Sequence, residues 1–213
     1  SFDHKSKSSV GLPENKFIFC CFNAHQKINL KIFKIWMRIL KERENSILWL
    51  LKDNELSENN LKREADNLGV DPERLVFAKK LEIDQHLSRL KFADLFLDTY
   101  PYGAHTTCSN ALRMCLPVIT LAGDSFASRV SASLLNSINL NELITNDLKS
   151  YEKLALNISN DKKLLNEIKN KIKLYSIKKN LFKPDIFTKN LEKSYKMIYE
   201  NYLNDHNPKE IEL

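Results

Sequence analysis

Short apolar runs alternate with longer amphipathic segments along the first two thirds of the chain. The apolar runs are too short for globular helices and carry apolar residues continuously, not at every second position. They cover residues 16–22, 46–52, 71–78, 93–98 and 116–123. Between them lie segments with helical spacing, at residues 28–43, 58–69, 82–92 and 106–115. Continuously apolar strands separated by helices predict a parallel sheet covered on both faces, that is, a doubly wound α/β domain ending near residue 145.

The last third of the chain changes to helix. Residues 147–204 carry two long amphipathic patterns, and in the second an apolar stripe predicts a packing face. The stripe consists of Phe187, Leu191, Tyr195, Ile198 and Tyr202. We expect residues 205–213 to form a flexible tail. Residues 1–15 read as the tail of a preceding segment, so that the domain proper covers residues 16–204.

Composition excludes few classes of function. The chain has 213 residues, 43% hydrophobic and 28% charged, with a formal net charge of +6. Because the lysines are spread along the whole chain, we expect no nucleic-acid partner, although a basic binding surface stays an alternative. No apolar run is long enough to predict a membrane span. The four cysteines form no CxxC pair, which favours reduced, buried thiols in a cytoplasmic protein.

Ligands of doubly wound folds collect beyond the carboxyl ends of the strands, so the turns after Phe22, Phe77 and Asp98 are the candidate sites. The third turn reads TYPYGAHTT, residues 99–107, and runs into a helix. Unpaired N–H groups and the positive end of the helix dipole there would suit a phosphate. We expect Gly103 to adopt a conformation that side chains disfavour, and the residues after it to donate hydrogen bonds. These are His105, Thr106 and Thr107; the alternative is an ordinary helix cap beside a surface histidine.

The other two turns carry cationic side chains. Lys27 falls at the start of the first helix, which is unfavourable unless an anion lies nearby, although it could also point into water. His86 and Arg89 share one helical face, where Arg89 could clamp a phosphate, and the backbone near Leu81 could pair with a flat heterocycle. A surface histidine and arginine are the alternative.

The sequence lacks the common metal and hydrolase motifs. It contains no DxD triplet, no HExxH, no clustered Cys/His set and no GxSxG elbow. We therefore predict no metal and no cofactor, with protein cations and dipoles neutralising any phosphate-bearing ligand.

Taken in order, the three turns resemble the C-terminal catalytic lobe of the protein O-GlcNAc transferase family, which includes the Spindly-type enzymes. The resemblance runs from about Gly11 to Tyr202 and is most specific in LDTYPYGAHTT and GDSFASRVSASLL. It implies a Rossmann-like lobe of a GT-B glycosyltransferase that binds a nucleotide-sugar donor. The reaction that it implies is inverting, metal-independent transfer, from UDP-GlcNAc, to serine or threonine hydroxyls of a protein acceptor.

The resemblance also implies residue roles. The diphosphate would be bound by Lys27, His105, Thr106 and Thr107. The donor pocket would be lined by His86, Arg89 and Asn110, next to the backbone at Leu81 that the turn itself suggests.

Three positions depart from the O-GlcNAc pattern and leave the donor open. Ala24 replaces a glutamine, Asn110 replaces the ribose-binding aspartate, and Ile83 replaces a lysine near the base. A degenerate, non-catalytic binding module and transfer of another sugar, such as fucose from GDP-fucose, are therefore the alternatives. The resemblance implies that the catalytic base and tetratricopeptide repeats belong to a further, N-terminal part of the polypeptide.

Overall fold

The computed structural model describes residues 6–211, and its central element is a six-stranded, fully parallel sheet with the order β3-β2-β1-β4-β5-β6. The reversal of strand order between β1 and β4 is that of a doubly wound fold and confirms the predicted class. The strands are β1 (Phe17–Cys21), β2 (Ser46–Leu51), β3 (Leu75–Ala78), β4 (Leu95–Leu97), β5 (Val118–Leu121) and β6 (Ile144–Thr145).

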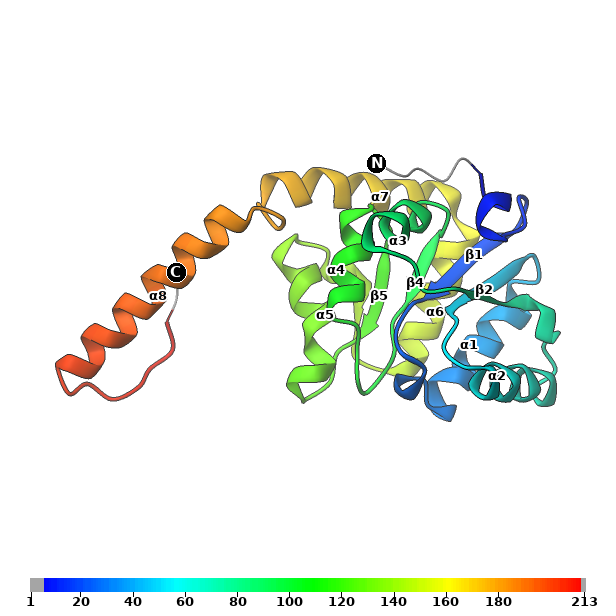
Figure 1. The fold of residues 1–213 in the computed structure, drawn as a ribbon, viewed down its shortest axis with the longest axis horizontal. Helices are drawn as coiled ribbons and strands as arrows, with labels where there is room; N and C mark the ends of the chain where they lie inside the picture. Colours follow the sequence, from blue (N-terminus) through cyan, green and yellow to red (C-terminus); the bar gives the residue numbers. More distant parts are fainter. Residues whose placement is uncertain (1–5, 212–213) are drawn as a thin grey trace.

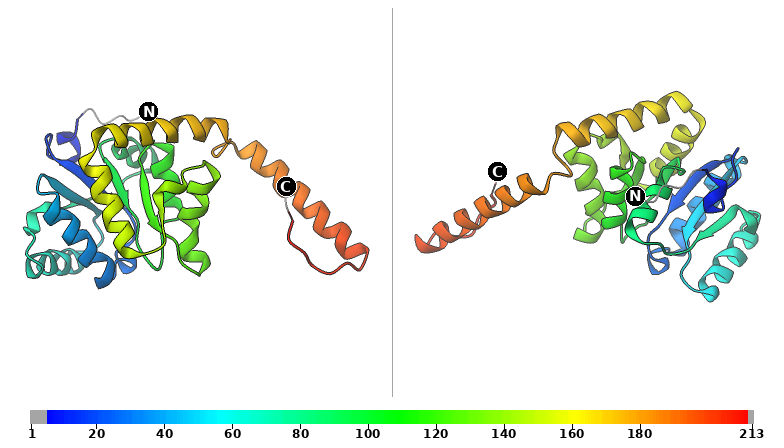
Figure 2. Two further views of the ribbon diagram at one scale, coloured as in Figure 1. Left: turned by 180° about the vertical axis from the view of Figure 1, so that it is seen from behind. Right: turned by 45° about the horizontal axis from the view of Figure 1, so that its top comes forward.

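Helices cover both faces of this sheet (Figures 1 and 2). On one face α1 packs against α6, and on the other α4 lies between α3 and α5. The helices are α1 (Leu30–Glu42), α2 (Glu55–Asn67), α3 (Ile83–Leu90), α4 (Thr106–Arg113), α5 (Phe126–Ser137), α6 (Leu148–Asn160), α7 (Lys162–Lys178) and α8 (Pro184–Leu203). Four 3-10 turns complete the elements: η1 (Ser8–Val10), η2 (His25–Lys27), η3 (Pro72–Arg74) and η4 (Asn141–Leu143).

Local sequence signals explain where most helices begin. Side chains of Asn29, Asn54, Ser125, Asp147 and Asp161 accept a hydrogen bond from a backbone N–H in the first turn of α1, α2, α5, α6 and α7, respectively. A glycine ends α2: Gly69 has a φ of +72°, which a side chain disfavours.

Large side chains between the sheet and its helices form the core. Trp36, Trp49, Tyr151, Phe19, Phe33 and Phe96 are fully buried. Leu12 also joins the core, so part of the predicted N-terminal tail packs on the domain. Residues 1–5 and 212–213 of the two predicted tails lie outside the described residues. The cysteines are free; three are buried and Cys115 is half-buried.

Helix α8 does not pack on the sheet. It extends away from the body of the domain after α7 (Figure 2), and it contains no buried residue. Phe187 is 68% exposed and Tyr195 is 62% exposed. The predicted packing face therefore has no partner within residues 6–211.

Candidate functional site

The site lies where the β1–α1 and β4–α4 loops meet, at the carboxyl edge of neighbouring strands. Lys27 belongs to η2, three residues before α1 and not in its first turn. Its Nζ donates to the carbonyl oxygen of Gly103 over 2.9 Å and lies 3.8 Å from the ring centre of Tyr102. The first and third predicted turns therefore come into direct contact.

Burial lowers the pKa of Lys27, and the charge of Asp98 opposes that lowering. A partly desolvated ammonium interacts more strongly with an anion than one in bulk water does. The resting contact with Gly103 uses one of its three N–H donors. The side chain therefore has donors left for a ligand at this edge.

Helix α4 begins without a side-chain cap. Its N-cap is His105, whose side chain accepts no capping hydrogen bond, and the threonines lie inside the helix. Among residues 6–211, no group pairs with the backbone N–H of Thr106, Thr107 or Cys108. The ordinary-cap alternative is therefore wrong, and three donors at the positive end of the helix dipole remain open beside Lys27.

His105 links the turn to α5. Its Nε2 lies 3.3 Å from the carbonyl oxygen of Ala127, which can only accept, so Nε2 carries a proton. The ring contacts Tyr102 at 5.4 Å and Phe126 at 5.9 Å between centroids. These contacts fix the ring beside the start of α4, and no group within residues 6–211 forms a hydrogen bond with its Nδ1.

The two threonines differ in what they offer. Thr106 is exposed, whereas the Thr107 hydroxyl donates to Oδ1 of Asn23. The hydroxyl proton of Thr107 is thus already used, contrary to the expectation that both hydroxyls are free donors. Its open contribution to an anion is the backbone N–H.

Gly103 has a different role from the one predicted. Its φ does not lie in the left-handed region. Instead, a Cβ at this position would lie 3.2 Å from Oδ2 of Asp98 and 3.4 Å from the carbonyl oxygen of Ala127. Glycine is needed here because the loop passes closely over a buried carboxylate.

That carboxylate, Asp98, is 1% exposed and is a residue of the site that the sequence analysis misses. Its Oδ1 accepts from the backbone N–H of Thr99 and Ala104, each over 2.7 Å, and its Oδ2 accepts from the Thr120 hydroxyl. Burial raises the pKa of Asp98, while these hydrogen bonds lower it. The turn is therefore folded around an internal anion.

Arg89 is not placed to clamp a phosphate. It is 2% exposed, and it donates to the Lys79 carbonyl over 2.6 Å and to Nδ1 of His86. Its guanidinium also lies 4.7 Å from the ring centre of Phe22. The clamp prediction is corrected for this reason: Arg89 holds the β3–α3 loop and His86 against the end of β1.

His86 is neutral near physiological pH. Burial and then the charge of Arg89 lower its pKa to about 4. Because Nδ1 accepts from Arg89, the neutral ring carries its proton on Nε2. The His86 ring contacts the Phe22 ring edge-on, with 5.2 Å between the ring centroids. The second predicted turn therefore lies against Phe22, the residue before Asn23.

The remaining predicted pocket residues show no contact with this cluster. Leu81 is exposed in the β3–α3 loop, and Asn110 is half-buried on α4, one turn after Thr106. In the part of the chain that the structure describes, the side-chain amide of Asn110 has no hydrogen-bond partner. Both positions stay predictions.

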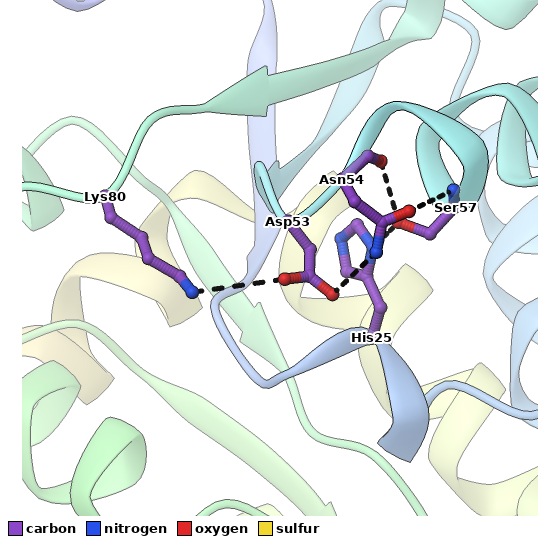
Figure 3. Close-up of polar contacts among 5 residues, drawn as sticks. All are labelled: His25, Asp53, Asn54, Ser57 and Lys80. Atoms are coloured by element: carbon purple, nitrogen blue, oxygen red, sulfur yellow. Dashed lines mark hydrogen bonds and ion pairs between the residues drawn. The ribbon is translucent and has the colours of Figure 1, made fainter.

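A second polar cluster lies beside the first, between the β1–α1 loop and α2 (Figure 3). His25 is buried and its Nδ1 lies 2.7 Å from the Ser57 hydroxyl. That hydroxyl donates to the Asn54 carbonyl, so His25 must donate from Nδ1. Asp53 and Lys80 face each other nearby at 3.9 Å. This arrangement ties η2, and with it Lys27, to the start of α2.

Neither a metal cluster nor a membrane helix is found. Within residues 6–211, no three His, Cys, Asp or Glu side chains come together as ligands for a metal ion. No helix in these residues combines the length and the apolar character that crossing a bilayer requires.

The chain is similar in sequence and in structure to known proteins. An Arabidopsis thaliana protein named as a probable UDP-N-acetylglucosamine–peptide N-acetylglucosaminyltransferase, SEC, is 33% identical over 203 residues, which is 95% of this chain and 21% of that protein. A Caenorhabditis elegans UDP-N-acetylglucosamine–peptide N-acetylglucosaminyltransferase is 32% identical over 73% of this chain and 14% of that protein. The structure of an O-GlcNAc transferase mutant from Thermobaculum terrenum superimposes with a TM-score of 0.83 at 28% identity, covering 87% of this chain and 36% of that one.

The chain thus spans about a fifth or less of the length of these two curated relatives. The structural similarity confirms the predicted Rossmann-like fold, which this chain shares with part of that O-GlcNAc transferase. The family model for glycosyl transferase family 41 matches residues 4–191, nearly the whole domain. The chain belongs to glycosyl transferase family 41.

Proposed function

We propose that this chain is the donor-binding lobe of an enzyme that transfers a sugar from a nucleotide sugar to hydroxyl groups of a protein acceptor. The observation that carries the proposal is the contact between Lys27 and the β4–α4 loop beside three open N–H groups of α4. The Lys27 ammonium, the positive end of the α4 dipole and the open N–H groups lie at the same turn, a combination that suits a diphosphate.

UDP-GlcNAc is the donor that we propose, because the curated relatives are named for UDP-N-acetylglucosamine. The nucleoside would lie toward Leu81, His86 and Asn110. A neutral His86 with its proton on Nε2 suits this role, because it can donate a hydrogen bond without adding a charge beside the uncharged base.

In the proposed reaction, an acceptor hydroxyl attacks the anomeric carbon with inversion and the nucleoside diphosphate leaves. Negative charge grows on the leaving diphosphate in the transition state, so Lys27 and the α4 amides would stabilise that state more than the bound donor. No metal enters this scheme. The catalytic base and the acceptor-binding repeats would belong to the rest of the polypeptide.

Calorimetry with UDP, GDP, UDP-GlcNAc and GDP-fucose tests the binding half of the proposal. We expect UDP and UDP-GlcNAc to bind, and Lys27→Met to weaken binding by at least tenfold, because a lost charged donor costs about 1.5–3 kcal/mol. Lys34→Met, at an exposed position on α1, is the matched control and should leave the affinity unchanged. Equal affinities for both variants would refute the role of Lys27.

The transfer half needs the full-length protein. Labelled UDP-GlcNAc and GDP-fucose are incubated with the protein and cell lysate, and labelled protein is the expected product with the first donor. We expect Lys27→Ala to lower turnover at least tenfold, since removing one such donor typically costs about 3 kcal/mol in barrier.

A second candidate, a binding module that holds a nucleotide without transferring sugar, is favoured by three substitutions. Ala24 and Ile83 carry no polar side-chain group, and Asn110 carries no charge where the O-GlcNAc enzymes have an aspartate. Nucleotide binding without any transfer by the full-length protein would support this candidate. Preference for GDP-fucose would support fucose transfer.

A further inference from the structure

One buried amide joins the two loops of the candidate site. Asn23 is 2% exposed and directly follows Phe22 at the end of β1. Its Nδ2 donates to Oδ1 of Asp98 over 3.1 Å and to Oγ1 of Thr99 over 2.7 Å, and its Oδ1 accepts from the Thr107 hydroxyl. One side chain thus contacts both ends of the β4–α4 turn, 75 residues or more away along the chain.

The hydrogen-bond network fixes the orientation of this amide. Oδ1 of Asp98 already accepts two backbone N–H groups, from Thr99 and Ala104, so it bears no proton. The Asn23 atom that faces it must be the donor, Nδ2, and the opposite atom must be the acceptor. The Thr107 hydroxyl can then only donate to Asn23. No other orientation satisfies these three contacts.

This bond has a consequence for the anion site. Thr107 is the second residue of α4, so its side chain determines how the first turn of the helix sits relative to the β1–α1 loop. Lys27 belongs to the same loop as Asn23 and reaches the same turn from the other side, at the Gly103 carbonyl. Asn23 and Lys27 therefore hold the turn at two separate points.

We propose that Asn23 is a positioning residue for the donor diphosphate: through Thr107 and Asp98 it fixes the first turn of α4 so that its open N–H groups and Lys27 converge on one phosphate. This rests on the proposed function. Asn23 itself does not touch the ligand in this scheme. An amide is required because the position must donate to a carboxylate and accept from a hydroxyl at once, which neither aspartate nor leucine can do.

The test combines two substitutions in a double-mutant cycle, read out by the calorimetric dissociation constant of UDP. Asn23→Ala removes all three contacts, and Thr107→Val removes the hydroxyl with little change in shape. We expect Asn23→Ala to weaken UDP binding at least tenfold and Thr107→Val to weaken it less. The double variant should bind within about threefold of Asn23→Ala, because both changes break the same connection. Fully multiplicative effects would mean that Thr107 binds the phosphate on its own and would overturn the inference.

Phosphorus NMR of bound UDP separates positioning from a general loss of stability. We expect the resonance of the β-phosphate to move in Asn23→Ala and Asn23→Asp relative to the unsubstituted chain. Ile172→Val, fully buried in α7, is the control that lowers stability without touching the turn. It should leave both the resonance and the affinity unchanged.

The outcomes are distinguishable. If the unsubstituted chain does not bind UDP, the proposed function fails and this inference fails with it. If that chain binds UDP and Asn23→Ala binds within twofold of it with the same β-phosphate resonance, only the positioning role is overturned. Should Asn23→Ala not fold, Asn23→Asp and Thr107→Val decide with the same two measurements.

Discussion

Lowering the pH should destabilise this domain through one histidine of the site. Burial and the Arg89 guanidinium lower the pKa of His86 to about 4, from about 6.5 in an unfolded chain. Nδ1 of His86 accepts from Nε and Nη2 of Arg89, at 3.2 and 2.8 Å, so a proton there would break these bonds and face a positive charge. Between pH 6.5 and 4 the unfolded state binds a proton that the folded state excludes, so stability falls as pH falls through this window.

The pKa difference sets the size of the effect. A lowering from 6.5 to about 4 corresponds to roughly 3.5 kcal/mol at most, since each pKa unit is worth about 1.4 kcal/mol. His86 is only partly buried, so solvent screening reduces the expected loss to about 1–2 kcal/mol.

Urea unfolding at pH 7 and pH 4.5 measures the loss, and His86→Gln isolates it. Glutamine does not titrate and retains an acceptor for Arg89, so other groups contribute equally to both proteins. We expect the free energy of unfolding of the unsubstituted chain to fall by about 1–2 kcal/mol more than that of the variant over this interval. Equal losses in the two proteins would refute the assignment of His86 as a neutral partner of Arg89.

Gly103, the exposed face of α8 and Lys27 can each be tested by a measurement. Gly103→Ala should lower the free energy of unfolding by about 1–3 kcal/mol and weaken UDP binding, because the added Cβ would press on Asp98. An unchanged melting temperature would contradict the close approach of the loop to Asp98. Phe187→Ala and Tyr195→Ala should each leave the free energy of unfolding within about 0.5 kcal/mol, since both side chains are exposed; a larger loss in denaturant unfolding would mean that α8 packs in solution. Because burial lowers the pKa of Lys27, the affinity for UDP should fall with rising pH at lower pH values than the ordinary lysine pKa of about 10.4 would give. Calorimetry between pH 7 and 10 would contradict this if the pH dependence of the dissociation constant fitted an unshifted lysine.

The fold could be predicted because its strands are buried on both faces. A strand such as β2, with five of its six residues buried, reads as an unbroken apolar run, and the helix that follows restores the polar pattern. Strand β6 has two residues and gives no period to detect, and α5, a helix that the pattern did not mark, has only three buried residues. Such elements form because of their contacts with the rest of the sheet, and their own sequences carry no clear periodic pattern.

The stripe on α8 illustrates the opposite case. Its spacing correctly indicates an apolar helix face, but periodicity carries no information about what covers that face. In residues 6–211 nothing does.

At the site, the sequence indicated the charged residue next to a turn but not the buried polar residues that hold the turn in place. Lys27 and the β4–α4 turn were predicted from the electrostatics of helix ends, which are local in sequence. Asn23 and Asp98 were missed because the hydrogen bond that joins them spans 75 positions of the chain, and the one from Thr107 to Asn23 spans 84. A signal existed: both lie within two residues of the carboxyl end of a buried strand, where such folds bind ligands.

The internal carboxylate explains why the first N–H groups of α4 have no hydrogen-bond partner within residues 6–211. A loop that reverses direction between a strand and a helix leaves several N–H groups without partners. Asp98 takes those of Thr99 and Ala104 on the inside, so the loop is stable without a ligand and the N–H groups of α4 stay open on the outside. If the proposed diphosphate binds here, the same carboxylate would repel it. In the proposed site Lys27, whose pKa is already influenced by the charge of Asp98, would offset the repulsion between that carboxylate and the phosphates, so its removal should cost more than the loss of a surface lysine.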